Sequence, residues 1–97
     1  MDEALVRQHA EAHGQATVAG DLKKAGGDLD KSAYGPAGEV MKQMPADLSG
    51  SEVTGVSAEG EEWLVLIRYT GAVDSATVES RWADRDGAPK IVDLKVI

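Results

Sequence analysis

Two histidines, His9 and His13, are the residues of this sequence best suited to chemistry. Their i,i+4 spacing places both imidazoles on one face of a helix, where they could act as acid or base, bind a ligand or hold a divalent metal ion. A zinc site would need a third ligand from elsewhere, and Glu11 has the wrong offset for the zinc-protease motif. We therefore expect no metal and no cofactor. The ordinary alternative for His9 is a hydrogen-bonded histidine in the core.

Aromatic and small polar side chains in the second half of the chain form another set of candidates. Stacked aromatic rings on one face of a sheet would make the floor of an apolar pocket, although such rings more often only supply the core. A small serine among them, Ser80, would point at a ligand or bond within the sheet. The predicted ligand-binding residues are His9, His13, Tyr34, Trp63, Tyr69, Ser80 and Trp82, with Met41 and Met44 at the rim.

Composition excludes several classes of protein. The 97 residues carry a net charge of −7, so nucleic acid and anionic membranes are poor partners because both need positive charge. The absence of cysteine excludes disulfides and a cysteine nucleophile. The longest unbroken apolar run is Trp63 to Ile67, far short of a membrane span. Since the chain starts with acidic residues, where a secretion signal would be basic, we expect a cytoplasmic protein.

The first half of the chain has the pattern of helices. Residues 2–19 favour helix and share an apolar stripe that includes His9, so His9 should face the sheet. Gly20 is a natural stop, and a weaker segment over 21–30 should break near Gly26-Gly27. A third helix, capped by Asp30 or Ser32, should end before Pro45, because the residue before proline avoids the helical region. The apolar stripe of the first helix comprises Leu5, His9, Ala12, Ala16 and Ala19.

From residue 51 the apolar residues recur at every second position, which is the period of a strand. Strands are predicted near 52–58, 62–70, 75–84 and 90–97, joined by short links that favour antiparallel hairpins.

The positions of opposite charges indicate how the last two predicted strands pair. One register places opposite charges across the ladder at Asp84–Lys90, Arg81–Asp93 and Glu79–Lys95. The same register sets Trp82 opposite Val92 and leaves Asp86-Gly87-Ala88 as the loop. Asp93, a tempting general base on the last strand, is therefore expected to form an ion pair on the face away from the helices, with Arg68 in the same network.

The preceding hairpin aligns best with Trp63 opposite Trp82, which gathers the apolar residues on one face. The helices should cover that face. An apolar part of the opposite face looks too large to leave bare, so we expect a second subunit to cover it, as in a homodimer formed through the sheet. That part comprises Leu64, Leu66, Ile91 and Ile97.

Three stretches of the sequence carry a resemblance to a known group of proteins. They are His9–Ala19 with Gly20-Asp21-Leu22, then Trp63–Gly71, then Ser80–Ala83 with Asp86-Gly87 and Lys90-Ile91-Val92. Together they span nearly the whole chain. The pattern resembles the nuclear transport factor 2-like superfamily, of cystatin-like shape, which includes polyketide-cyclase-like proteins, ketosteroid isomerase and many small bacterial proteins.

This resemblance implies an α+β fold in which N-terminal helices pack on a curved antiparallel four-stranded sheet. The shape would be cone-like, with a pocket between the sheet and the first helix. Residues 1–97 would form one domain, with helices at about 2–45 and the sheet at about 51–97. Where the family usually has an additional strand near the third helix, this chain reads as helix or loop, which would truncate the pocket.

Two classes of function follow from these observations, because one scaffold hosts many functions. The first is a small-molecule-binding or scaffold module that works as a homodimer and takes an apolar small molecule. The alternative is a small isomerase, dehydratase or cyclase-like enzyme with His9 or His13 as general base. Such an enzyme needs a second polarising group, for which Tyr69, Tyr34 or a tryptophan N–H is suited. A pure interaction module would have no cavity at all.

Overall fold

All the helical segments precede the strands along the chain, as expected. The computed structural model describes residues 1–97. The helical segments are α1 (Glu3–Ala19), α2 (Leu22–Gly27), the 3-10 turn η1 (Lys31–Ala33) and α3 (Tyr34–Gln43). The strands are β1 (Gly50–Glu59), β2 (Glu62–Thr70), β3 (Ser75–Arg85) and β4 (Ala88–Val96). They form one four-stranded antiparallel sheet in the order β1-β2-β3-β4, so the predicted α+β class is confirmed.

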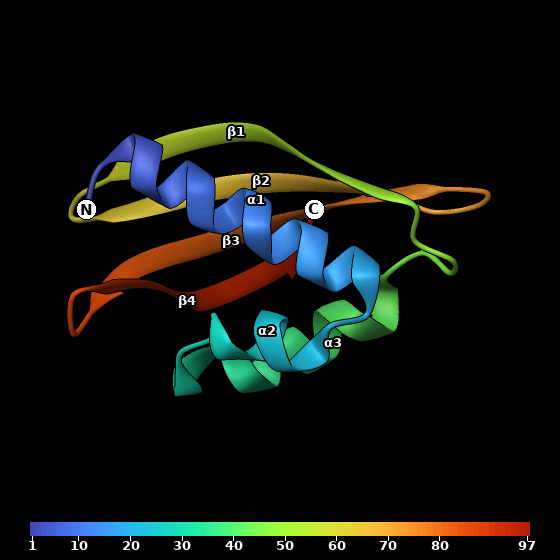
Figure 1. Ribbon diagram of the computed structural model, residues 1–97, viewed down its shortest axis with the longest axis horizontal. Helices are drawn as coiled ribbons and strands as arrows, with labels where there is room; N and C mark the ends of the chain where they lie inside the picture. Colours follow the sequence, from blue (N-terminus) through green and yellow to red (C-terminus); the bar gives the residue numbers. More distant parts are fainter.

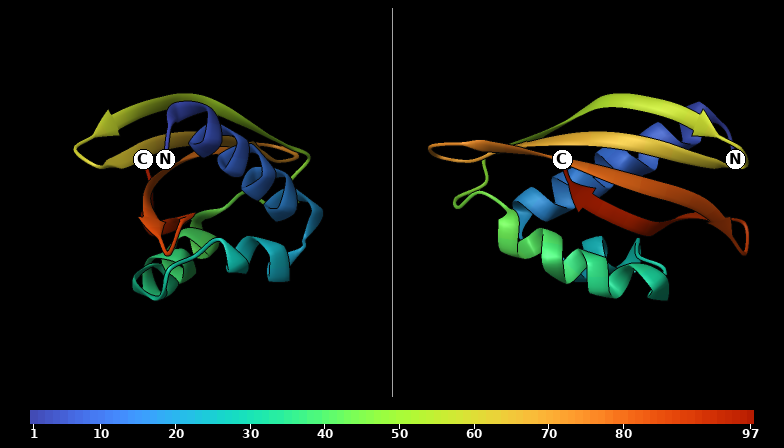
Figure 2. Two further views of the ribbon diagram at one scale, coloured as in Figure 1. Left: turned by 60° about the vertical axis from the view of Figure 1, so that its left-hand side comes forward. Right: turned by 180° about the vertical axis from the view of Figure 1, so that it is seen from behind.

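The helices cover one face of the curved sheet (Figure 1). Helix α1 packs against β1 and β2, while η1 and α3 pack against β4. Seen from the side, α2 and α3 lie together below the sheet, and α1 runs between them and the upper strands (Figure 2). The core fills the space between these layers, and its fully buried side chains include Val6, Val65, Ile67, Trp82 and Ile91. No helix combines the length and the apolar character needed to cross a membrane.

Helix α1 begins and ends at residues that favour helix ends. The Asp2 carboxylate accepts a hydrogen bond from the Leu5 N–H at 2.8 Å, and Gly20 closes the helix with φ of 74°. The buried face of α1 lies about one residue, or roughly 100° around the helix, away from the predicted apolar stripe. Leu5 and Ala19 are exposed and His9 is only half-buried. The buried residues are Val6, Ala10, His13, Gly14 and Ala16.

Gly14 explains why this face of α1 is turned inward. A Cβ atom at Gly14 would lie 2.8 Å from Ser51 Oγ and 3.1 Å from Ser51 Cβ, so the missing side chain lets the helix approach β1 closely. By contrast, a Cβ at Gly38 in α3 would meet nothing within 4 Å.

Alanine is expected to have opposite effects at these two helical glycines. Gly38→Ala should raise the free energy of unfolding by up to about 1 kcal/mol, because alanine is the better helix former. Gly14→Ala should lower it by about 1–2 kcal/mol, because overpacking against Ser51 outweighs the same gain. Urea unfolding followed by circular dichroism measures both. Equal gains at the two sites would contradict the close contact between α1 and β1.

The register of β2 and β3 is confirmed, with Trp63 opposite Trp82. The register of β3 and β4 is confirmed only as far as Arg81, which lies opposite Asp93. A bulge then shifts the pairing by one residue, so Trp82 lies opposite Ile91 and not opposite Val92.

The turn between β3 and β4 gives the physical reason for the bulge. Asp86 and Gly87 both have positive φ, 56° and 85°, as in the two-residue turns that match the twist of a hairpin. The loop is therefore one residue shorter than predicted, and the bulge absorbs the difference. As a result Asp84 lies opposite Pro89 instead of Lys90. Ile91, expected on the outer face, is fully buried in the core.

The predicted charge network is correct at one pair and wrong at the others. Glu79 and Lys95 approach to 3.9 Å. Arg81, however, bonds Glu59 at 2.9 Å and Glu62 at 3.1 Å, because its long side chain reaches two carboxylates at the β1–β2 turn. The Asp93 carboxylate instead accepts from the Leu94 N–H at 3.0 Å. Lys90 donates to the Gly27 carbonyl, and Arg68 forms no ion pair within the chain.

Residues 28–30 attach the helical half of the chain to β4. The Ile91 N–H donates to the Asp28 carbonyl at 2.7 Å, and the Asp30 N–H donates to the Ile91 carbonyl at 2.8 Å. These bonds form a short parallel bridge between Leu29 and Ile91. The bridge fixes the position of Asp28 beside α1.

Candidate functional site

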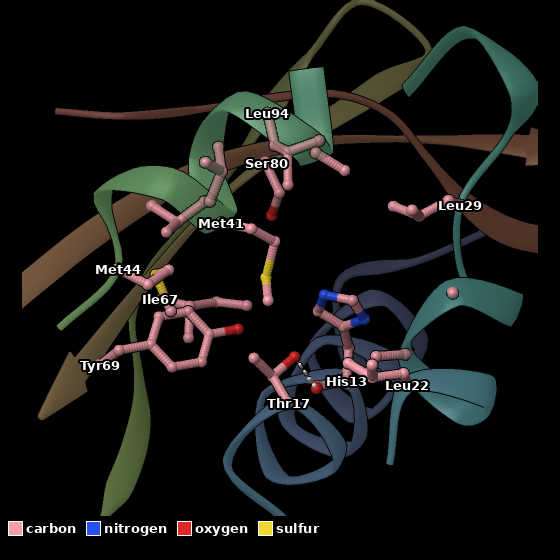
Figure 3. Close-up of a pocket in the computed structure, with 15 residues that line it drawn as sticks. His13, Thr17, Leu22, Leu29, Met41, Met44, Ile67, Tyr69, Ser80 and Leu94 are labelled. Carbon is pink, nitrogen blue, oxygen red and sulfur yellow. Dashed lines mark hydrogen bonds between the residues drawn. The ribbon is translucent and has the colours of Figure 1, made fainter. Parts of the chain in front are cut away.

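A cavity of about 260 Å³ lies between the sheet and the helices. Strands β2 and β3 form one wall, α1 and α3 form the sides, and α2 with Leu29 lies near the exposed end (Figure 3). Leu22 and Met41 are largely exposed although they line the cavity, so the opening lies between α2 and α3. Of the 15 lining residues 11 are hydrophobic, which makes the interior suited to an apolar molecule.

His13 presents its imidazole to this cavity. Its Nδ1 atom lies 3.0 Å from the Oδ2 atom of Asp28, and both side chains are about 10% exposed. The opposite edge of the ring, with Nε2, points into the cavity (Figure 3). Nε2 has no hydrogen-bond partner within the chain, and since every buried side-chain nitrogen and oxygen has one, solvent reaches Nε2 through the cavity. The arrangement is a ring held by a buried carboxylate, with a free nitrogen aimed at apolar space.

The environment keeps Asp28 ionised. Burial raises the pKa of this carboxyl group, but the hydrogen bond and charge of His13, with the charges of Lys24 and Lys90, outweigh burial and hold the pKa below its usual value. An ionised carboxylate only accepts hydrogen bonds, so the hydrogen of a neutral His13 ring must lie on Nδ1. Nε2 is then the hydrogen-bond acceptor that faces the cavity.

Trp82 and Ser80 support the histidine from behind. The rings of His13 and Trp82 meet edge to face, with centroids 6.0 Å apart and an interplanar angle of 86°. The Trp82 Nε1–H donates to Ser80 Oγ at 2.9 Å, and Ser80 Oγ donates to the Val65 carbonyl at 3.3 Å. Both polar groups are therefore occupied within the chain.

Tyr69 adds a hydroxyl group to the cavity. The side chain is buried, and its hydroxyl points toward the interior beside Thr17 (Figure 3). Burial raises the pKa of the Tyr69 hydroxyl, and the neighbouring Thr17 hydroxyl opposes this rise. Thr17 itself donates to the His13 carbonyl at 2.9 Å. The Tyr69 hydroxyl is therefore neutral, lines the same cavity as His13 and has Thr17 as a hydrogen-bond neighbour.

The structure brings together only some of the residues predicted for the site. His13, Tyr69 and Ser80 line the cavity, and so do Met41 and Met44. The remaining four do not line it. His9, expected to face the sheet, is only half-buried and does not line the cavity, because the buried face of α1 is rotated from the predicted stripe. Tyr34 points to solvent, Trp63 is half-buried elsewhere on the sheet, and Trp82 is packed behind His13 in the core. The tryptophans therefore do not form the floor of the pocket.

Asp28 and Thr17 are the functional residues that the sequence did not reveal. Thr17 stands four residues after His13, so the same helix face could have indicated it. No local signal links Asp28 to His13, because their contact depends on the bridge between Leu29 and Ile91. No group of three or more metal-binding side chains is present, and the pair His9–His13 gains no third ligand.

Comparison with known proteins identifies the fold. No protein-family model and no curated protein matches the chain. A crystal structure of an "NTF-2 like protein of unknown function" from Burkholderia xenovorans LB400 is similar, with 25% sequence identity and a TM-score of 0.63. The match covers 98% of this chain and 83% of that chain. With helices packed on one face of a four-stranded antiparallel meander, this protein has the nuclear transport factor 2-like fold.

Proposed function

We propose that the protein binds a small, mainly apolar molecule in the cavity, with a polar group of the ligand at His13. The observation that carries this proposal is the unpaired Nε2 atom of His13 inside an otherwise apolar cavity. Apolar walls with a few convergent polar groups are typical of small-molecule sites. Since an apolar cavity of about 150 Å³ holds benzene, this cavity has room for about ten non-hydrogen atoms.

Filling the cavity from α3 is expected to weaken binding strongly. Ala37 lines the cavity, and Ala37→Phe would place a ring in the space that the ligand needs. The matched control is Ala4→Phe, an exposed alanine of α1. Calorimetric titration with a small alkylbenzene should show binding to the wild type and to Ala4→Phe, and at least about tenfold weaker binding to Ala37→Phe. Equal affinity in all three proteins would place the ligand elsewhere.

Acid–base catalysis is a second candidate function, favoured by the contact between His13 and Asp28. A histidine whose Nδ1–H bonds a carboxylate is oriented to take a proton at Nε2. The Tyr69 hydroxyl lies in the same cavity and is suited to polarise a carbonyl oxygen. His9 and Tyr34 lie outside the cavity, and the tryptophan N–H of Trp82 is bonded to Ser80, so none of these three supports the enzyme.

The test of this second candidate is exchange of ligand hydrogens with deuterium oxide, followed by NMR. A ketone that fits the cavity should exchange its α-hydrogens faster with the protein than without it. Asp28→Asn should slow that exchange by about 100-fold or more, because the ring loses its orientation. If the ketone binds but its exchange is not accelerated, the binding function stands and acid–base catalysis on that ketone is excluded.

We also propose that a second copy of the chain covers the outer face of the sheet, defined as the face away from the helices. Because Ile91 is buried in the core, the apolar part of this outer face is smaller than predicted, but Leu64 and Leu66 stay half-exposed on it. Arg68 and Asp93 point from this face and have no ion-pair partner in their own chain. In a two-fold dimer, Arg68 of each subunit can pair with Asp93 of the other subunit across the interface.

Sedimentation measures this association. The wild type is expected to sediment as a dimer, and Arg68→Asp should dissociate it, because like charges then face each other in both contacts. The double variant Arg68→Asp/Asp93→Arg restores opposite charges and should restore the dimer. A monomeric wild type at high concentration would contradict the proposal.

A further inference from the structure

We infer that the cavity selects ligands that carry a hydroxyl group over ligands of equal size that are apolar or only accept hydrogen bonds. This inference rests on the proposed function, that a small molecule binds in the cavity. It concerns which polar group of that molecule meets His13, and it follows from the hydrogen-bond partners of the cavity's own polar groups.

The first step is the direction of the hydrogen bond at His13. When the His13 ring is neutral, Asp28, which is an acceptor only, holds the ring hydrogen on Nδ1 and leaves a lone pair on Nε2. A ligand that fills the cavity removes water from Nε2. If the ligand cannot donate a hydrogen bond, a buried acceptor is left without a partner, which is unfavourable. A ligand hydroxyl group supplies the missing donor.

The second step concerns the other polar groups that line the cavity. The Thr17 hydroxyl donates its hydrogen bond to the His13 carbonyl, and the Ser80 hydroxyl donates to the Val65 carbonyl. Neither can donate to a ligand without breaking a bond in the protein. Tyr69 has a neutral hydroxyl group that faces the cavity, with Thr17 as its hydrogen-bond neighbour, and this group can turn toward a ligand without leaving the cavity.

A ligand hydroxyl group fits this pair of partners. It donates to His13 Nε2 and can accept from the Tyr69 hydroxyl, so both protein groups are satisfied when water leaves. An ether or a ketone can use only Tyr69 and leaves Nε2 unpaired. A hydrocarbon satisfies neither group. Sites built to bond a substrate hydroxyl discriminate strongly against analogues that lack it, for the same reason.

Three probes of similar size test the selection, namely 4-propylphenol, 4-propyltoluene and 4-propylanisole. The phenol donates and accepts, the anisole only accepts, and the toluene derivative does neither. Calorimetric titration should show the phenol binding about tenfold or more tightly than either of the others. Without a donor contact the order is reversed, because the phenol is the best hydrated of the three.

Asp28→Asn tests the reason for the preference. The side-chain amide introduced at position 28 can donate to Nδ1 of His13, which moves the ring hydrogen to Nε2 and turns the cavity-facing nitrogen into a donor. The phenol's advantage over the anisole should then fall at least tenfold. His9→Gln is the matched control, because His9 lies on the same helix outside the cavity, and it should keep the wild-type preference.

NMR of the wild-type protein gives a readout that does not depend on a variant's folding. The ¹⁵N resonance of His13 Nε2 should move when the phenol is added and stay in place when the anisole is added. If none of the probes binds, the proposed function is overturned. If all three bind but the phenol is no tighter and Nε2 does not respond, the binding function survives and the selection for hydroxyl groups is overturned.

Discussion

His13→Leu is expected to lower the free energy of unfolding by about 3–5 kcal/mol at pH 7.5. The loss arises from Asp28 more than from the histidine. In the wild type the carboxylate bonds His13 Nδ1 at 3.0 Å in a site where both side chains are about 10% exposed. Without the ring, the buried charge keeps only Lys24, whose half-exposed side chain lies 3.7 Å away, and the weaker influence of Lys90. A buried charge without its partner is among the most destabilising changes a core can undergo.

The effect of this substitution should depend on pH in a direction set by Asp28. In the wild type its pKa is lowered, so its contribution to stability is present above the unfolded value of 3.8 and is lost as the pH falls through the folded pKa. In His13→Leu the effect of burial, which raises the pKa of Asp28, is no longer outweighed. The pKa of Asp28 in the folded variant therefore rises above its value in the unfolded chain. The loss of stability caused by the unpaired Asp28 charge is then greatest at neutral pH, and it disappears as the pH falls through that raised pKa.

The double variant His13→Leu/Asp28→Leu isolates this charge. Replacing a buried pair by apolar residues of similar volume is often neutral or stabilising, so the double variant should be more stable than His13→Leu at pH 7.5. The difference between the two variants should shrink as the pH is lowered to 5. Urea unfolding followed by circular dichroism at both values measures it. A double variant no more stable than the single one would show that Asp28 is well solvated in the absence of His13.

Trp82→Ala is the second substitution with a large expected effect, a loss of about 3–5 kcal/mol in the free energy of unfolding. Trp82 is fully buried in the core, and its ring packs against the edge of His13. Its removal leaves a large cavity and takes away the donor that bonds Ser80 Oγ at 2.9 Å. For a chain of this size the loss is a large part of the total stability.

Trp63→Ala is the matched control, because Trp63 lies opposite Trp82 in the ladder but is only half-buried. It should cost clearly less than Trp82→Ala, since less apolar surface returns to water. Urea unfolding followed by far-ultraviolet circular dichroism gives both values without relying on tryptophan fluorescence. Equal losses would contradict the different burial of the two rings. The Trp82 variant should also loosen His13, seen as a broadened ring resonance in NMR.

Several ends of the helices and strands could be read from the sequence because the signals act over a few residues. The predicted cap of α3 was wrong, because Asp30 caps η1 and Ala33 precedes α3 without a side-chain hydrogen bond. Asp2 and Gly20 bound α1, and α3 ends at Gln43, before Pro45. The alternation of apolar residues gave all four strands, and the match of Trp63 with Trp82 gave the register of the central hairpin. Each of these depends on capping, backbone geometry or the period of a strand, which neighbouring residues determine.

Only the tertiary structure decided which histidine faces the cavity and what holds it. The inward face of α1 depends on the close approach of Gly14 to Ser51, and the position of Asp28 depends on its attachment to Ile91. Ile91 in turn points inward because a tight turn at Asp86-Gly87 requires a bulge. These contacts join residues far apart in the chain, so no local pattern encodes them. The sequence alone therefore determined the architecture, and packing between its distant parts determined the site.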